Sequence, residues 1–266
     1  MSEHSEAAGP SEAAGPSEAA RSGAVVIGAS SGVGRAIARE LATRGWDLVV
    51  AARSADVLAA LADDLARDHA IAATALTLDV CGSDDDLDAF CSTATTVLST
   101  IDAVLITTGA IAARDDGTGA WDDMRSLVDT NLVGVMAIAG RFVSVMEEAD
   151  HGTLVLFSSI AAEAPRNRNV AYAAAKAGLN AFAASMQHRV NGTGVGVQLV
   201  TLGYVRTAMT AGQDLKLPQA DPAQVARRVA DGLGDGSRTI HEPRWWGLVT
   251  RVLRGLPRGV YRRLKF

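Results

Sequence analysis

The segment that most constrains the fold is a glycine-rich turn between a short apolar stretch and a helical one. Residues 24–27 read Ala-Val-Val-Ile, residues 28–34 carry Gly28, Gly32 and Gly34, and residues 35–41 have the composition of a helix. Glycine permits a tight turn and a close approach of backbone to a ligand, and the N-terminus of the following helix attracts an anion. A glycine turn can be purely structural, but its place after a first strand predicts a pyrophosphate-binding loop.

Apolar stretches of strand length alternate with helical patterns along most of the chain. The sequence predicts strands at 24–27, 47–52, 73–78, 103–106, 153–157 and 195–200, and helices at 35–41, 54–69, 84–98, 121–147 and around Tyr172. This alternation predicts an α/β fold, a single-domain Rossmann-type doubly wound parallel sheet. Such sheets bind ligands at the carboxyl ends of their strands. Six candidate residues fall at these ends: Gly28, Arg53, Asp79, Gly109, Ser159 and Thr207.

We expect three parts in the chain. Residues 1–22 repeat Ser-Glu-Ala-Ala-Gly-Pro, in which Gly and Pro interrupt helix formation and large apolar side chains are lacking. This stretch is therefore predicted to be a disordered tail. Residues 23–242 are predicted to form a dinucleotide-binding catalytic domain, and residues 243–266 a basic amphipathic C-terminal extension.

The composition narrows the classes of protein. The chain has 266 residues, 48% of them hydrophobic, and a net charge of −5, so no nucleic-acid partner is expected. Cys81 and Cys91 are the only cysteines, too few for a disulfide framework or a metal cluster. We therefore predict no metal site and a reducing, cytoplasmic location. No stretch approaches the roughly 20 consecutive apolar residues of a membrane span.

The end of the second predicted strand bears on the choice of cofactor. A carboxylate there would bind the 2′-hydroxyl of an adenosine ribose and favour NAD(H). The chain instead has Ala52 followed by Arg53, and the next acid is Asp56. Because an arginine pairs with a 2′-phosphate, we predict NADP(H) rather than NAD(H). The alternative is that Arg53 is an ordinary surface residue.

A serine, a tyrosine and a lysine form the candidate catalytic set. Ser159 ends an apolar run, and Tyr172 and Lys176 lie four apart in an alanine-rich segment. Residues four apart share one face of a helix, so an ammonium is expected beside the phenol, where it would lower the pKa of Tyr172 and ease proton transfer. Asn131 falls inside a predicted helix, where asparagine is unfavourable, and is either a helix-bending core amide or a functional group.

With these residues in place, residues 23–240 resemble the short-chain dehydrogenase/reductase family. Its glycine motif matches Gly28, Gly32 and Gly34, and its adenine-contacting acid, helix asparagine and catalytic triad match Asp79, Asn131, Ser159, Tyr172 and Lys176. Two departures concern mainly structural positions. The usual Asn-Asn-Ala-Gly is Thr-Thr-Gly-Ala at residues 107–110, and the usual Pro-Gly is Leu-Gly at residues 202–203.

The resemblance implies roles for these side chains. Ser159 would bind the substrate carbonyl, Tyr172 would donate the proton, Lys176 would hold the nicotinamide ribose, and Asn131 would anchor a water that reprotonates Lys176. Thr207 would bind the carboxamide. The family pattern also implies a homodimer or homotetramer through helices near 121–147 and 170–190. The full set of expected cofactor-binding residues is Gly28, Ser30, Ser31, Gly32, Val33, Gly34, Arg53, Asp79, Val80, Thr108, Gly109, Tyr172, Lys176, Val205 and Thr207.

The C-terminal segment concentrates positive charge. From His241 onwards there are seven Arg and Lys residues against Glu242 alone. Between the arginines, apolar residues recur at helical spacing: Trp245, Leu248, Val249, Val252, Leu253 and Leu256. A basic amphipathic helix with tryptophan is typical of binding to an anionic lipid surface, which would place the protein peripherally on the inner face of the membrane. The alternative is that the apolar face packs on the body or closes an oligomer.

These features together predict an NADPH-dependent ketoreductase. The tail and residues 158–176 are similar to a subgroup of the family, the bacterial reductases of decaprenylphosphoryl-2-keto-erythro-pentofuranose, which implies a 2-keto sugar substrate linked to a polyprenyl phosphate. One alternative is a reductase or dehydrogenase of a soluble ketone or secondary alcohol. Another is a non-catalytic NADP(H)-binding regulator, which would not need Ser159, Tyr172 and Lys176.

Overall fold

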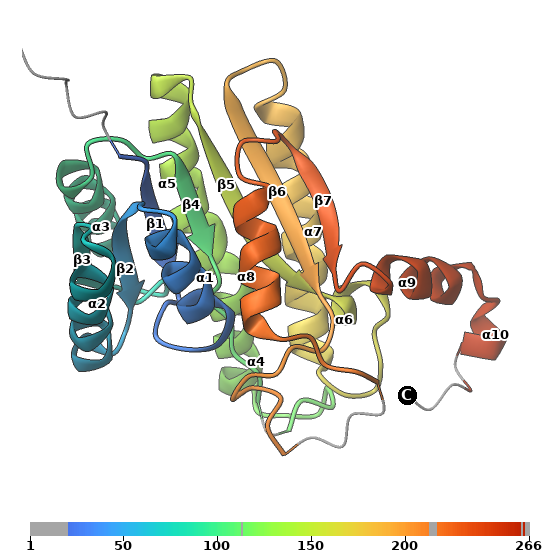
Figure 1. Cartoon of the computed structure of the whole chain (residues 1–266). Helices are drawn as coiled ribbons and strands as arrows, with labels where there is room; N and C mark the ends of the chain where they lie inside the picture. Colours follow the sequence, from blue (N-terminus) through green and yellow to red (C-terminus); the bar gives the residue numbers. More distant parts are fainter. Residues whose placement is uncertain (1–20, 113, 213–216, 262, 264–266) are drawn as a thin grey trace, which may run out of the picture.

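The computed structural model describes residues 21–112, 114–212, 217–261 and 263. Its centre is a seven-stranded sheet in the order β3-β2-β1-β4-β5-β6-β7, with every neighbouring pair parallel. The predicted doubly wound α/β fold is therefore confirmed (Figure 1). Most of the expected N-terminal tail, residues 1–20, lies outside the described residues.

The strands follow the apolar stretches of the sequence. They are β1 Gly23–Ile27, β2 Asp47–Ala52, β3 Ala73–Thr77, β4 Ala103–Ile106, β5 Gly152–Ser159, β6 Val195–Leu202 and β7 Arg238–Glu242. In the register of the sheet, Val26 lies between Val50 of β2 and Leu105 of β4. Near-continuous apolar strands are required because helices cover both faces of a parallel sheet.

Helices pack on both faces of the sheet (Figure 1). One face carries α1 Gly32–Thr43, α2 Ala55–His69 and α8 Pro222–Asp231, and the other carries α3 Asp84–Val97, α5 Gly134–Ala149 and α7 Val170–Arg189. The described residues also form the shorter helices α4 Trp121–Val128, α6 Ile160–Glu163, α9 Trp246–Gly255 and α10 Arg258–Tyr261.

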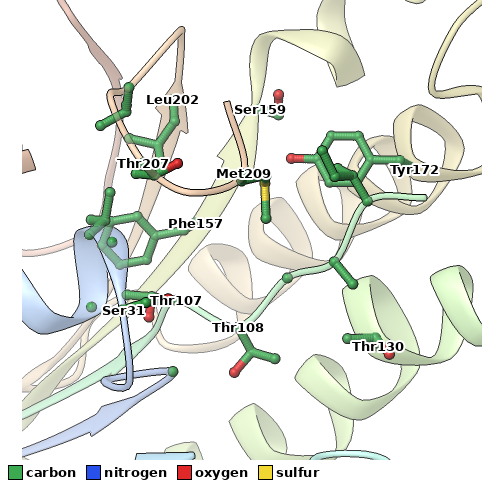
Figure 2. A pocket seen from close by; sticks show the side chains of 18 of the residues that line it. Ser31, Thr107, Thr108, Thr130, Phe157, Ser159, Tyr172, Leu202, Thr207 and Met209 are labelled. Carbon is green, nitrogen blue, oxygen red and sulfur yellow. The ribbon is translucent and has the colours of Figure 1, made fainter. Parts of the chain in front are cut away.

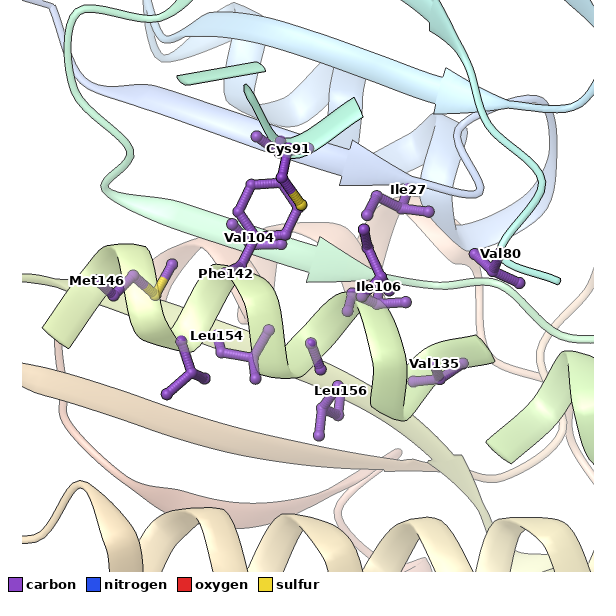
Figure 3. Packing of buried hydrophobic residues seen from close by; sticks show 14 of the residues in the cluster. Ile27, Val80, Cys91, Val104, Ile106, Val135, Phe142, Met146, Leu154 and Leu156 are labelled. Carbon is purple, nitrogen blue, oxygen red and sulfur yellow. The ribbon is translucent and has the colours of Figure 1, made fainter. Parts of the chain in front are cut away.

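Alternate residues of the strands divide between two cores. Along β1, Val25 and Ile27 face α3 and α5, whereas Ala24 and Val26 face α1 and α8. In the first core the ring of Phe142 is fully buried (Figure 3). It contacts the ring of Phe90 edge to face, with the ring centroids 6.2 Å apart. Burying a side chain of this size contributes about 1.5–3 kcal/mol. The two cores fix the helices on both faces of the sheet, and thereby the loops at the carboxyl ends of its strands.

The helix predicted over residues 121–147 is not continuous. A π-helical turn, η1, spans Asp129–Val133 and separates α4 from α5. Asn131 lies in this turn and is completely buried. A π turn leaves one carbonyl without its usual partner and often marks a functional region. Here the Asn131 amide donates to the Leu127 carbonyl, so the side chain compensates for the widened backbone.

The C-terminal segment packs beside β7 through a residue that the amphipathic pattern did not include. Trp246, not Trp245, is buried, and its indole lies where a Cβ on Gly203 would clash. Trp246 also meets the Tyr204 ring edge-on at 5.5 Å and stacks on Trp245 at 4.5 Å. Leu248 and Val252, which belong to the predicted apolar face, stay exposed. The face of α9 that packs on the rest of the protein is therefore not the face that the spacing of the apolar residues predicted.

Candidate active site

One cavity of about 340 Å³ runs along the carboxyl edge of the sheet. The strand order reverses between β1 and β4, whose crossovers leave on opposite faces, and such a switch point opens a crevice for ligands. The structure brings to this cavity every residue that the sequence proposed for the cofactor, together with Ser159. Asn131 is the exception, because it lies behind the wall of the cavity.

The glycine turn lines one end of the cavity and is held against β4. Gly28 and Gly32 have positive φ angles of 92° and 56°. A Cβ on Gly34 would overlap the carbonyl of Gly28 and the hydroxyl of Thr107, so only glycine fits there. The Thr107 hydroxyl donates to the carbonyl of Ile27 at 2.9 Å and ties β4 to β1. This bond gives Thr107 a structural role at the first position of the Thr-Thr-Gly-Ala segment, where the family pattern has asparagine.

The N-terminus of α1 opens onto the same region. Ser31 is its N-cap residue, makes no side-chain capping bond in the structure, and the first turn holds no acidic residue. The first N–H groups of a helix have no intrahelical acceptor, and the helix dipole is positive at this end. The glycine turn lets the backbone approach a ligand closely beside this helix N-terminus, an arrangement that fits the diphosphate of a dinucleotide.

Two charged side chains line the adjoining end of the cavity. Arg53 follows β2, and Asp79 follows β3. Asp79 accepts a hydrogen bond from the backbone N–H of Cys81 at 2.9 Å, which fixes its carboxylate. The exposed Arg53 guanidinium is placed to meet a phosphate at the adenosine end. The residues present therefore fit a phosphorylated dinucleotide.

Ser159, Tyr172 and Lys176 meet at the middle of the cavity. Ser159 ends β5 and caps α6, its Oγ accepting from the N–H of Ala161 at 3.2 Å. Figure 2 shows the Tyr172 hydroxyl pointing into the cavity, toward the side where Ser159 and Met209 lie. Ser158 turns the other way and donates to Asn180 of α7. Both serines line the cavity, but the Ser158 hydroxyl is bonded to α7.

The pKa values of Tyr172 and Lys176 differ from one prediction made from the sequence. Burial raises the pKa of Tyr172, and a hydrogen bond with Ser159 partly offsets that rise. The Lys176 ammonium lies 5.9 Å from the tyrosine ring centroid and donates to the carbonyl of Phe157 at 2.9 Å. Burial lowers the pKa of Lys176 to about 8. The prediction that Lys176 depresses the pKa of Tyr172 is therefore wrong for this structure, because desolvation dominates both groups.

Asn131 holds the wall of the cavity rather than lining it. Its amide donates to the carbonyls of Ala110 and Leu127, both at 2.9 Å, and its Oδ1 accepts from the N–H of Ala110 at 3.2 Å. A Cβ on Gly109 would lie 3.1 Å from Oδ1 of Asn131 and 3.7 Å from Nζ of Lys176. Gly109 is thus the spacer between them. Of the two interpretations left open by the sequence, the geometry favours the core amide.

Asp115 supports the catalytic helix and was missed by the sequence analysis. This buried residue lies after β4, and its carboxylate accepts from the N–H groups of Ala171 at 2.8 Å and Tyr172 at 3.0 Å. Its backbone carbonyl accepts from the N–H of Val170 at 3.1 Å. Asn169, the N-cap residue of α7, makes no side-chain capping bond. No local signal could have found this contact, because 56 residues separate Asp115 from Ala171.

The loop after β6 closes the cavity over the glycine turn. The methyl group of Thr207 would lie 3.3 Å from a Cβ on Gly32. Thr210, another residue that the sequence analysis missed, donates its hydroxyl to the carbonyl of Val205 at 2.6 Å and accepts from the N–H of Thr207 at 3.1 Å. A threonine three residues after another is a common pattern, so the spacing of Thr207 and Thr210 alone did not indicate that Thr210 has a role in the site. The pair fixes Thr207 at the cavity.

Comparison with known proteins assigns the chain to a family. Residues 22–217 match the model of the short chain dehydrogenase family, so the protein belongs to the short-chain dehydrogenase family of oxidoreductases. An uncharacterized oxidoreductase from the mprA 5′ region of Streptomyces coelicolor is 34% identical over 243 residues, which cover 90% of this chain and 94% of that protein. The sequence resemblance to this family is thereby confirmed.

Two solved structures share the fold. A variant of actinorhodin polyketide ketoreductase with NADPH has a TM-score of 0.75 and 23% identity, and the match covers 83% of this chain and 95% of that one. A short-chain dehydrogenase from Sphingobium yanoikuyae in complex with NADPH has a TM-score of 0.77 and 23% identity, with 91% and 96% covered.

Among the residues that the structure describes, no three His, Cys, Asp or Glu side chains are grouped so that they could hold a metal ion. Within the same ranges, no helix combines the length and the apolar character that a membrane span requires.

The contacts of Asp115 generate a prediction. We expect Asp115→Ala to leave the N–H groups of Ala171 and Tyr172 without their acceptor, lowering the free energy of unfolding by about 1–3 kcal/mol. Urea unfolding measures the loss, and amide hydrogen exchange should speed up at those two residues first. The control is Asp116→Ala, which removes a surface carboxylate bonded only locally and should change stability by no more than about 0.5 kcal/mol. Equal effects of the two substitutions would contradict the supporting role.

Proposed function

We propose that the protein is an NADP(H)-dependent ketoreductase that transfers a hydride to a ketone, with Tyr172 as the proton donor. The observation that carries this proposal is the meeting of Ser159, Tyr172 and Lys176 in the cavity that also runs over the glycine turn. Family membership supports the oxidoreductase class. Two proteins of the same fold, a ketoreductase and a dehydrogenase, are known with NADPH.

The side chains support a simple division of labour. The Ser159 hydroxyl donates to the substrate carbonyl and, with the Tyr172 hydroxyl, stabilises the oxygen as negative charge develops. Bound NADPH supplies the hydride for the carbonyl carbon. Tyr172 gives its proton to the alkoxide, so the ketone, the hydride and one proton together become the alcohol. Because burial raises the pKa of Tyr172, its phenol stays protonated and able to donate at neutral pH.

Lys176 and Asn131 take indirect parts in this proposal. Burial lowers the pKa of Lys176 to about 8, which is close to neutral pH, so its ammonium can return a proton to Tyr172 after turnover. The Asn131 side chain is committed to the backbone of Ala110 and Leu127. We therefore assign Asn131 to positioning the loop at Gly109, in place of the water relay that the family pattern implied.

Arg53 and the glycine turn support NADP(H) as the cofactor. Asp79 is the one carboxylate among the described residues that line the cavity, and it follows β3, whereas the end of β2 carries Arg53. A guanidinium there favours a 2′-phosphate over a 2′-hydroxyl. We place Thr207 at the nicotinamide end of the cofactor, since its loop closes over Gly32.

The finer substrate proposal is a 2-keto sugar linked to a polyprenyl phosphate. Its support is the similarity of residues 158–176 and of the tail to reductases of such a substrate, together with the basic character of α9. Exposed Arg244, Arg251 and Arg254 flank the exposed apolar side chains of Leu248 and Val252. This surface fits an anionic membrane face, so we propose peripheral association on the cytoplasmic side.

We also propose that the protein forms a homodimer or homotetramer. The exposed apolar side chains of Val133 and Met136, at the junction of η1 and α5, support this assembly because water-exposed side chains of this kind gather at interfaces. A monomer mass from light scattering would contradict it.

The first test of the function is Tyr172→Phe. Removing the proton donor should lower kcat for ketone reduction by about a hundredfold or more while NADPH still binds. NADPH oxidation with a lipid-linked 2-keto-pentose and with soluble ketones gives the rate, and quenching of protein fluorescence gives cofactor binding. A variant with the rate of the unmodified protein would disprove the mechanism. A wild-type enzyme that binds NADPH but reduces none of the ketones would favour the regulator.

The second test concerns the cofactor. Arg53→Asp should shift the ratio of kcat/KM values from NADPH toward NADH by about tenfold or more, since it replaces an attraction for the 2′-phosphate by a repulsion. The matched control is Arg39→Asp, an exposed arginine on α1 away from the cavity. A ratio that stays the same in both variants would remove Arg53 from the cofactor site.

The third test concerns the membrane. The full-length protein should sediment with phosphatidylglycerol vesicles more than with phosphatidylcholine vesicles, and Leu248→Glu combined with Val252→Glu should abolish that excess. The control pair, Val57→Glu with Val97→Glu, changes two exposed valines on α2 and α3, away from the C-terminal segment. Failure of the unmodified protein to sediment with either vesicle would refute membrane association and leave the reductase proposal standing.

A further inference from the structure

We propose that Glu163 and His241 are positioning residues for Ser159, because the bond between their side chains fixes the short helix α6, which follows Ser159 directly. The proposal rests on the ketoreductase function, in which the Ser159 hydroxyl binds the substrate carbonyl. Neither Glu163 nor His241 is among the described residues that line the cavity. The pair therefore acts on the reaction through Ser159 and not by contact with the ketone.

The two side chains meet although 78 positions separate them in the chain. Glu163 is the last residue of α6, and His241 lies in β7. Nε2 of His241 is 2.8 Å from Oε1 of Glu163. A carboxylate can only accept a hydrogen bond, so the imidazole donates it. The His241 and Glu163 side chains are 21% and 11% exposed, and a hydrogen bond that is largely shielded from water is stronger than one at the surface.

Helix α6 carries the effect of this bond to Ser159. It is a single turn, Ile160–Glu163. Ser159 caps its first end, where Oγ accepts from the N–H of Ala161 at 3.2 Å. One helical turn is not stable by itself, so its direction depends on what holds its two ends. The strand β5 holds the end at Ser159, and His241 holds the end at Glu163.

The sheet places Ser159 and His241 at its carboxyl edge, two strands apart. In the register of the sheet Ser159 of β5 pairs with Leu202 of β6, and Leu202 pairs with Glu242 of β7. His241 directly precedes Glu242. Because neighbouring strands lie about 4.8 Å apart, α6 and its last side chain span roughly 10 Å from β5 to β7. The pair thus ties the segment that carries the serine to a second, distant strand of the same sheet.

Helix α9 keeps the imidazole turned toward Glu163. A Cβ on Gly247 would lie 3.2 Å from Nδ1 of His241, so the backbone of α9 lies directly against this side of the ring. Trp246, next to Gly247, is 3% exposed and seats α9 on the rest of the protein. With Nδ1 against α9 and Nε2 bonded to Glu163, the ring has little freedom to rotate. Helix α9 therefore contributes to the position of Ser159 from outside the described lining of the cavity.

The position of the Ser159 hydroxyl matters because it has two partners in the proposed reaction. It is hydrogen-bonded to Tyr172, the proton donor, and it must also meet the substrate carbonyl. A misplacement of about 1 Å in such a group can cost on the order of a hundredfold in rate. The glycine turn that serves the cofactor follows β1, which is not a neighbour of β5 or β7 in the sheet. Loss of the pair should therefore act on kcat and leave NADPH binding intact.

The first experiment compares two histidines that make the same kind of bond. His241→Ala should lower kcat for the best ketone substrate about tenfold while the Kd for NADPH stays unchanged. His241→Gln keeps an N–H that can reach Glu163 and should restore most of the rate. The control, His151→Ala, breaks a bond of the same length, from Nε2 to Oδ1 of Asp102 at 2.8 Å, at the amino ends of β4 and β5, and should keep the rate. Equal rate losses in the two alanine variants, or no loss in either, would overturn the proposal.

A double-mutant cycle tests whether the histidine acts through Ser159. Ser159→Ala removes the hydroxyl that the pair positions, so adding His241→Ala should lower kcat by less than about twofold further. A second full loss of about tenfold would show that His241 acts elsewhere and would overturn the proposal. If His241→Ala does not fold, Glu163→Ala removes the same bond from the side of α6 and takes its place in the cycle, since alanine is compatible with a helix.

The proposal can be separated from the function on which it rests. If the unmodified protein reduces no ketone, the ketoreductase proposal fails, and amide hydrogen exchange decides whether the pair positions Ser159. The N–H of Ala161 donates to Oγ of Ser159, so its exchange should speed up about fivefold or more in His241→Ala and stay unchanged in His151→Ala. Unchanged exchange at Ala161 in His241→Ala would overturn the positioning role, whatever the activity.

Discussion

The structure depends on a parallel sheet that is buried on both faces. Because every strand runs in the same direction, the carboxyl ends of all seven strands share one edge of the sheet. The reversal of strand order beside β1 and β4 opens that edge to ligands. The Gly28–Thr107 contact draws the two strands together where the cavity begins. Residues that are more than 170 positions apart, such as Gly32 and Thr207, meet there. The position of the cavity is therefore set by the topology of the sheet, and the side chains at that position determine its chemistry.

Desolvation sets the pKa values of the two candidate catalytic groups, Tyr172 and Lys176. Tyr172 and Lys176 lie where water is excluded, so burial raises the pKa of the phenol and lowers that of the ammonium to about 8. Both shifts move the pair toward neutral forms, which suits proton exchange between them near neutral pH. The supports of this arrangement are carbonyls and a carboxylate: Phe157 accepts from Lys176, and Asp115 accepts from the first turn of α7. Such fixed acceptors keep the reacting groups aligned.

The C-terminal segment joins two surfaces with different chemistry. Its inner side contacts Tyr204, which lines the cavity, through Trp246, and Pro165 through Tyr261. Its outer side leaves Leu248 and Val252 exposed between arginines. The segment can therefore support one wall of the cavity and still present a basic apolar face. Gly203 is the residue that permits this packing, because a side chain there would occupy the position of the Trp246 indole.

The sequence by itself determined the elements and their order, and it predicted the candidate catalytic set. Strand periodicity, the glycine spacing and the four-residue step from Tyr172 to Lys176 are local patterns, and local patterns survive without knowledge of the fold. Tertiary structure alone decided the rest. It placed Asn131 in a π turn behind the cavity, brought Asp115 to the helix of Tyr172, and seated α9 through Trp246. It also reversed the expected shift of the Tyr172 pKa. These outcomes depend on burial and on contacts between distant residues, which no spacing in the chain encodes.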